Sequence, residues 1–333
     1  MNLDLTMPTV LFLVALLAMF LNKKVESKLK GALENREFRT RDTILLVATM
    51  GITISVVVLI PEFALMAIFL FAYSMLLFIF THIFSDFNKT RASIFCLAFL
   101  VITIAAALAL QLNLVTNTLG ILGPIAFYGL SLFTLSALIY EHRRTATGER
   151  WYLAVLPPAL FICLYAFYNR TSLWFPYILN LYGIAFAVLI ILYMGTLFTW
   201  KTTLIFTGLL TIVDTILVLV TRTMVSAAMS VQALRLPVLV SLPVLPLIVT
   251  ERGLQYMSLG LGDFFFAGLL ATQTMKKYGR LYGVCAIITM ALSFGIFEIL
   301  LIYYEVSAFP GTVMIIIGWL PIAFLSFIRK SKR

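Results

Sequence analysis

One stretch decides the fold, residues 43–84, which read TILLVATMGITISVVVLIPEFALMAIFLFAYSMLLFIFTHIF. Glu62 is the only Asp, Glu, Lys or Arg that it contains. A helix of about 20 apolar residues spans the hydrocarbon core of a bilayer, so this stretch is long enough for two spans. Because proline is tolerated at the start of a helix and not in its interior, Pro61-Glu62 divides the stretch into helices at 43–60 and 63–84.

The composition of the whole chain extends this conclusion. Of 333 residues, 62% are hydrophobic and only 11% are charged, and the mean hydropathy is +1.06. Soluble domains carry about 25% charged residues, so this chain has too little charge to cover itself in water. We expect an all-α polytopic membrane protein in which no soluble domain interrupts the chain.

Apolar runs bounded by charged residues predict about eleven spanning helices. They cover roughly residues 7–21, 43–60, 63–84, 92–112, 118–140, 151–168, 176–195, 200–221, 262–275, 281–304 and 310–328. The first and the ninth are short for a span. We expect residues 1–199 to form a scaffold that includes a possible path for substrate, and residues 200–333 to form a catalytic part.

The basic residues indicate an orientation. With this set of spans, 20 of the 24 Lys and Arg residues fall on one side, and the four on the other side are Arg170, Arg222, Arg235 and Arg252. Because cytoplasmic loops carry the excess of Lys and Arg, the N-terminus is predicted outside and the C-terminus in the cytoplasm, most simply of the cell membrane. Topology therefore accounts for the basic excess, and no nucleic acid is needed to explain it. The longest loop, residues 222–259, is then external, and three prolines within residues 236–249 predict an extended or broken element there.

Cysteine and histidine usage argues against disulfides and metals. Cys96, Cys163 and Cys285 lie in apolar runs without metal-ligand spacing, and His82 and His142 are sixty residues apart. The expected chemistry therefore needs neither a metal nor a cofactor.

Three acids fall within the predicted spans: Asp214, Asp263 and Glu298. An intramembrane carboxyl is costly and is by default a candidate functional group. Asp214 is eight residues before Arg222, which places it ~12 Å inside the outer end of its helix. Asp263 begins the next span after the external loop, so both aspartates are expected in the outer half of adjacent spans.

Two carboxyls at one depth meet the requirement of aspartic protease chemistry. Like charges held close together in a medium of low dielectric cannot both ionise, so the pair keeps one proton. The ionised carboxylate accepts a proton from water, and the protonated carboxyl donates to the carbonyl oxygen of the scissile bond.

At this point the sequence resembles a known family. Gly260-Leu261-Gly262-Asp263, followed by aromatic residues at the start of a span and preceded by an acid in the previous span, resembles the GxGD intramembrane aspartyl proteases, in particular presenilin, signal peptide peptidase and their archaeal homologues. The resemblance covers about residues 200–328. It implies that Asp214 and Asp263 are the catalytic pair and that the core has nine spans, so about two of the eleven predicted spans, near the N-terminus, are additional to it. We expect residues 260–262 and Pro310-Gly311 to bind substrate, because Gly260 and Gly262 expose backbone groups on which an unwound substrate can pair as an added strand.

The sequence departs from the family pattern at two sites. Val213 stands where the family usually has tyrosine, and the Pro-Ala-Leu motif is absent as such. Pro310-Gly311 is our expected replacement, because it begins the last span at the level of Asp263. Pro321 is eleven residues further along, ~16 Å deeper in a regular helix, and is better explained as a kink.

The predicted orientation resembles that of signal peptide peptidase and is inverted relative to presenilin. By analogy the substrates are transmembrane peptides with a cytoplasmic N-terminus, such as remnant signal peptides or type II anchors. The prepilin peptidases, which also have a GxGD aspartate, typically place a basic residue after it, whereas this chain has Phe264.

Two other classes remain open at this stage. A secondary transporter would use the intramembrane acids for proton or cation coupling, but such proteins favour internal repeats and sites near the midplane, and no repeat is evident. A membrane scaffold without activity leaves the paired aspartates unexplained. Glu298 has no role in the protease interpretation, and the sequence leaves the oligomeric state open.

Overall fold

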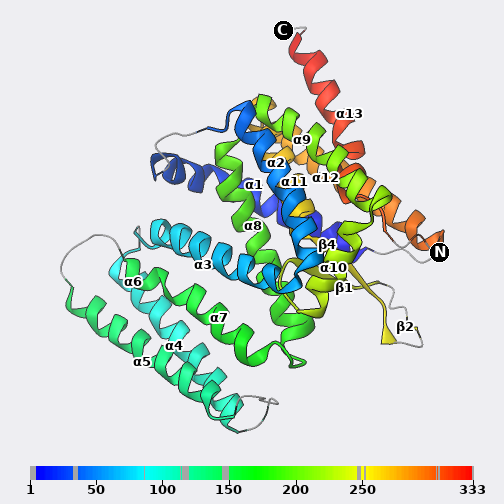
Figure 1. The fold of residues 1–333 in the computed structure, drawn as a ribbon. Helices are drawn as coiled ribbons and strands as arrows, with labels where there is room; N and C mark the ends of the chain where they lie inside the picture. The colour runs from blue at the N-terminus through cyan, green and yellow to red at the C-terminus, as the bar shows by residue number, and fades with distance from the viewer. Residues whose placement is uncertain are drawn as a thin grey trace. The chain divides into compact units, whose positions relative to one another are not determined.

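The computed structural model is predominantly helical (Figure 1). It describes residues 5–32, 37–85, 87–112, 114, 120–144, 150–245, 249–250, 253–304, 306 and 308–331. Of the residues used for the predicted orientation, Arg36, Arg252, Lys332 and Arg333 lie outside this part of the chain.

The described helices and strands follow one another in a simple order. In the first part of the chain they are α1 (Thr6–Ala32), α2 (Thr40–Leu59), α3 (Pro61–Ser85), α4 (Lys89–Gln111), α5 (Leu122–Arg143), α6 (Trp151–Ala154), α7 (Leu156–Tyr168), the π-helical turn η1 (Trp174–Ile178) and α8 (Leu179–Leu197). The second part comprises α9 (Trp200–Thr215), the π-helical turn η2 (Ile216–Val220), α10 (Thr223–Ala233), β1 (Leu239–Pro243), β2 (Val249–Thr250), β3 (Gly253–Leu254), β4 (Tyr256–Gly260), α11 (Leu261–Tyr278), α12 (Arg280–Tyr303) and α13 (Gly311–Ser331).

Each of the eleven predicted apolar runs coincides with a helix, or with a helix and an adjoining short segment. In the described part of the chain, seven helical segments are long and apolar enough to cross a membrane, and three shorter apolar helices accompany them. The chain is therefore an all-α polytopic membrane protein in its main architecture, with small β-hairpins added in the region predicted to be extended. The residues around Pro243 do form a strand, but α10 was not expected.

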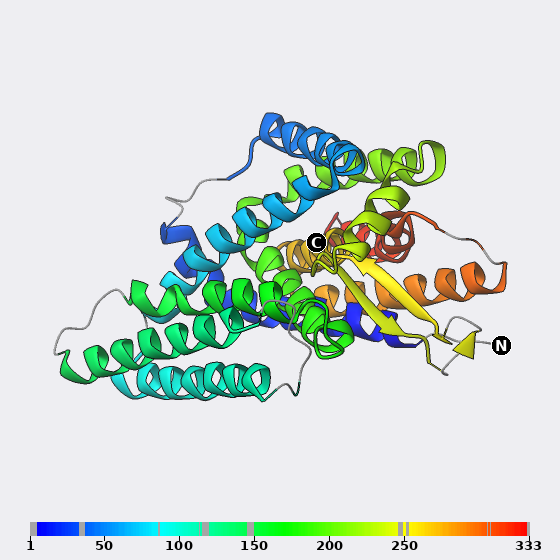
Figure 2. The ribbon, with the colours of Figure 1, turned by 60° about the horizontal axis from the view of Figure 1, so that its bottom comes forward.

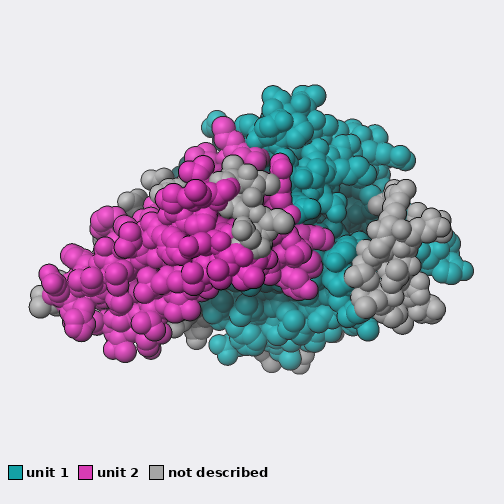
Figure 3. Space-filling view, turned by 90° about the horizontal axis from the view of Figure 1, so that it is seen from below, with its two compact units in different colours: residues 1–64, 179–333 teal, residues 65–178 magenta. Residues whose placement is uncertain are grey.

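The compact units do not follow the predicted boundary at residue 199. One unit joins residues 1–64 to residues 179–333, and the other contains residues 65–178; Figure 3 colours them separately. The first unit unites distant segments because α1 packs against α8, α11 and α12, and α2 packs against α9 and α10. The two N-terminal helices thus belong to the same unit as both aspartates.

Helix α11 forms the centre of the first unit. It contacts α1, α8, α9, α12 and α13, and residues 264–274 are all buried. A side chain at Gly268 would overlap Ile191 of α8, so the small residue permits the close approach of these helices. The apolar run predicted for the ninth span is short because α11 carries polar residues. It can carry them because other helices of the protein, rather than lipid, surround it. Gln273, for example, donates to the carbonyl oxygens of Gly195 and Phe198 at 3.1 and 2.8 Å.

The second unit has its own core. Helix α4 packs against α5, and α5 packs against α7. Ser131 donates to Thr103 at 2.9 Å between α5 and α4, and the Tyr168 hydroxyl donates to the Ala106 carbonyl at 2.7 Å. Such bonds satisfy polar groups that would otherwise be costly to bury among apolar helices.

Candidate active site

Asp214 lies in the last turn of α9, immediately before the helix changes form. From Ile216 the backbone becomes π-helical, and the Thr221 N–H donates to the Ile216 carbonyl at 2.9 Å. Short π-helical segments are rare and occur frequently at functional sites. The Asp214 side chain is half-buried, as expected for a carboxyl that borders a cavity.

Asp263 is placed by the transition from a strand to a helix. Strand β4 runs directly into α11, with Gly260 as the N-cap residue and Asp263 as the third residue of the helix. An acid in this first turn interacts favourably with the positive end of the helix. The carboxyl turns back toward the cap, so that a Cβ built on Gly260 would lie 3.4 Å from Asp263 Oδ2.

The first turn of α13 meets both aspartates through consecutive residues. Gly311 lies against Asp263: a Cβ at this glycine would be 2.5 Å from Oδ1 and 2.7 Å from Cγ. Thr312 contacts Asp214 instead, and its hydroxyl donates to Oδ2 at 2.6 Å while its backbone N–H approaches the same oxygen at 3.4 Å. Two acids that are 49 residues apart in sequence therefore meet at one helix end.

The two carboxyls border one cavity of about 740 Å³. Its lining combines α9, η2, α10, β1, β4, α11, α12 and α13, and includes Gly260 and Gly311 beside the aspartates. Most other lining residues are apolar, and they include Met224, Met229 and Met257. Methionine side chains are flexible and adapt to irregular partners, so this surface suits an apolar ligand of variable shape.

A β-hairpin forms one wall of the cavity (Figure 2, yellow). Strands β1 and β4 are antiparallel, with Ser241 opposite Ser258 and Leu239 opposite Gly260. Two backbone hydrogen bonds, from Leu261 N–H to Val238 O and from Val244 N–H to Gln255 O, lie just beyond the two ends of this ladder. They show which of the opposed residues form hydrogen-bonded pairs. Hydrogen-bonded and non-hydrogen-bonded pairs alternate along an antiparallel ladder. The backbone N–H and C=O groups of Ser258 and Gly260, which belong to non-hydrogen-bonded pairs, therefore point away from β1.

The outer edge of β1 is already occupied. The Asn180 side chain of α8 accepts from the Ser241 N–H at 2.8 Å and donates to the Ser241 carbonyl at 2.6 Å. Pro243 has no N–H, and its carbonyl accepts from the Thr6 hydroxyl at 2.9 Å. The edge of the hairpin that lies beside the aspartates is thus the edge of β4.

The structure brings together most of the predicted site residues. Asp214, Asp263, Gly260 and Gly311 all line the cavity. Leu261 and Pro310 are buried next to it, and Gly262 is exposed in the first turn of α11.

Pro321 is exposed in the middle of α13, ten residues beyond Gly311. Of the two prolines that the sequence offers, Pro310 is therefore the one beside the aspartates. The residues that sequence reasoning missed are Thr312 and Asn180, since a single threonine or asparagine in an apolar run gives no distinctive signal.

Glu298 lies in α12 and is 0% exposed. Phe294 and Leu301 of the same helix line the cavity, whereas Glu298 is not among the lining residues described. The structure therefore assigns it to the interior of the helix bundle rather than to the pair of aspartates.

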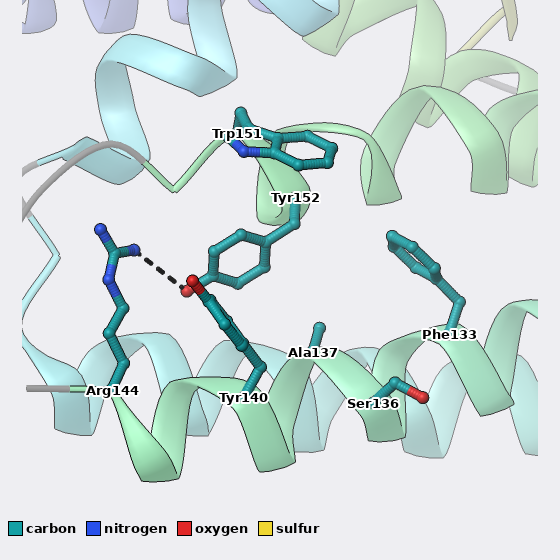
Figure 4. A pocket seen from close by; sticks show the side chains of 7 residues that line it. All are labelled: Phe133, Ser136, Ala137, Tyr140, Arg144, Trp151 and Tyr152. Carbon is teal, nitrogen blue, oxygen red and sulfur yellow. Dashed lines mark hydrogen bonds between the residues drawn. The ribbon is translucent and has the colours of Figure 1, made fainter.

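A second cavity lies within the other unit, between the end of α5 and α6 (Figure 4). Beside it, buried Glu141 forms an ion pair with Arg150 at 2.9 Å and also accepts from the Tyr152 hydroxyl. Arg144 donates to that hydroxyl at 3.4 Å, and this hydrogen bond raises the pKa of the guanidinium above its ordinary value. The arrangement connects α5 to α6, and Glu141 is the one acid among the described residues that form it, so we regard it as a structural cluster.

Comparison of the sequence with protein-family models matched none of them, and comparison with curated proteins found no match.

Proposed function

We propose that the chain is an intramembrane aspartyl endopeptidase with Asp214 and Asp263 as its catalytic pair. One observation carries the proposal: two carboxyls from different helices border the same cavity and are held by consecutive residues, Gly311 and Thr312, of a third helix. Neighbouring carboxyls in a site of low dielectric supply an acid and a base together.

The reaction that this pair supports is hydrolysis of a peptide bond. The carboxylate takes a proton from water while the water oxygen bonds to the carbonyl carbon, and the protonated carboxyl gives its proton to the carbonyl oxygen. The resulting gem-diol then collapses: the C–N bond breaks, the amine leaves with the proton first taken from water, and a diol hydroxyl returns a proton to the other carboxyl. The pair ends in its starting protonation state, and no cofactor takes part.

The hairpin supports a mode of substrate binding. A transmembrane helix has all its backbone groups paired, so its scissile bond must first unwind. An unwound segment can replace those bonds by adding as a strand to an exposed sheet edge. We assign this role to the edge of β4 at Ser258, because Asn180 and Thr6 occupy the edge of β1 and the Gly260 N–H is hydrogen-bonded to Asp263.

The substrates that fit are apolar transmembrane segments. The cavity is lined mainly by apolar residues, four of them methionines, and apart from the two aspartates no charged side chain is among its described lining residues. If the N-terminus is outside, Asp214 lies in a helix that runs outward, and remnant signal peptides and type II anchors are the expected class.

The test is cleavage of a model signal peptide by the purified protein in liposomes. Wild type should release two fragments, whereas Asp214→Asn and Asp263→Asn should each abolish cleavage while keeping the melting temperature close to that of wild type. Because the pair acts as a unit, the double variant should be no worse than either single variant. Turnover by either single variant would refute the assignment, and such a result would favour the transporter alternative, in which the acids carry protons or cations.

A further inference from the structure

Thr312 interacts differently with the two aspartates. Its side chain is almost fully buried, at 4% exposure, in the first turn of α13. Its hydroxyl and its backbone N–H both approach Asp214 Oδ2, at 2.6 and 3.4 Å. The preceding residue, Gly311, lies against Asp263 and has no side-chain donor to offer. Asp263 also lies at a helix N-terminus, that of α11, and accepts from the backbone N–H of Gly260, so the Thr312 hydroxyl is the donor that distinguishes the two carboxyls.

The hydroxyl and the backbone N–H of Thr312 both favour negative charge on Asp214. The first N–H groups of a helix have no partner within the helix, and this end carries partial positive charge. A backbone N–H can only donate, so Asp214 Oδ2 is an acceptor at this position. Hydrogen bonds donated to a carboxylate favour its charged form and are stronger than bonds between neutral groups.

We propose that Thr312 is a positioning residue that keeps Asp214 as the ionised member of the pair, which makes Asp214 the base and Asp263 the acid. The inference rests on the proposed proteolytic function and goes beyond it, because the resemblance to a family of aspartyl proteases does not say which carboxyl carries the proton. Asp214 then accepts the proton of the attacking water, and Asp263 protonates the carbonyl oxygen.

The experiment compares the pH dependence of cleavage in Thr312→Val and Thr312→Ser. Valine keeps the shape of the side chain and removes the hydroxyl, whereas serine retains the donor. We expect Thr312→Val to lower kcat about tenfold or more and to move the acidic limb of the profile about one pH unit upward, because the carboxylate has lost a donor that favours its charged form. Thr312→Ser should restore the position of the limb.

A second measurement does not depend on turnover. In the Asp263→Asn background, infrared spectroscopy of the isotope-labelled Asp214 carboxyl should show protonation beginning at higher pH when Thr312 is also changed to Val. Thr312→Ala, which removes the hydroxyl without adding a second methyl group, should give the same shift and replaces the valine variant if that one folds poorly.

The outcomes separate this inference from the proposed function. If both aspartate variants abolish cleavage but Thr312→Val leaves the profile and the infrared titration unchanged, the positioning role is wrong and the protease assignment stands. A shift of the basic limb alone would also overturn the inference, because it would make Asp214 the acid. If cleavage persists without the aspartates, the proposed function itself fails.

Discussion

Gly311→Ala is the most direct test of the geometry at the aspartates. The added Cβ would lie 2.5 Å from Oδ1, 2.7 Å from Cγ and 3.0 Å from Oδ2 of Asp263. Non-bonded carbon atoms prefer separations of about 3.5–4.0 Å. Either the carboxyl or the start of α13 must therefore move by about 1 Å.

A displacement of this size has a large effect on catalysis and a small one on stability. Misplacing a reacting group by about 1 Å can cost about 100-fold in rate, which corresponds to about 2.7 kcal/mol in the activation free energy. The fold is less affected, since overpacking costs about 1–3 kcal/mol and replacing Gly by Ala at a compatible helical position recovers about 0.4–1 kcal/mol. We expect cleavage to fall about 100-fold in a protein that still folds.

Gly208→Ala is the matched control. This glycine is exposed in α9, six residues before Asp214, and a Cβ there meets no atom within 4 Å. The same substitution at this position should retain most of the activity, because it leaves both aspartates in place. The assay is cleavage of the model signal peptide in liposomes, with melting temperatures measured in parallel. Wild-type activity in Gly311→Ala, or equal losses in both variants, would refute the reasoning.

Two further predictions concern the hairpin and the topology. Ser258→Pro removes the N–H that points away from β1 and spares the ladder between β1 and β4, so it should lower the cleavage rate severalfold and raise KM; an unchanged KM would argue against strand addition. In a background without native cysteines, a membrane-impermeant maleimide added from outside should label Ala233→Cys in α10 and miss Arg143→Cys at the end of α5, both positions being exposed. The reverse labelling would overturn the orientation and, with it, the expected substrate class.

The sequence was enough to determine that this protein is surrounded by lipid and where its helices lie along the chain. Charged residues make up only 11% of the chain, and each long apolar run can satisfy its backbone in lipid only as a helix. Prolines, charges and run lengths therefore located the helices well. The sequence could not determine how many of them cross the membrane, because α11 is covered by five other helices and carries polar residues that a lipid-facing span would not tolerate.

The sequence also singled out Asp214, Asp263 and Pro310-Gly311, since an acid or a proline is conspicuous in an apolar run. Only the tertiary structure placed Gly311 against one aspartate and Thr312 on the other, and set Glu298 apart from both. The reason is physical: charge and hydropathy are properties of single residues and can be read along the chain, whereas hydrogen bonds such as those of Thr312 and Asn180 arise between segments 61 to 98 residues apart, which meet only when the helices pack.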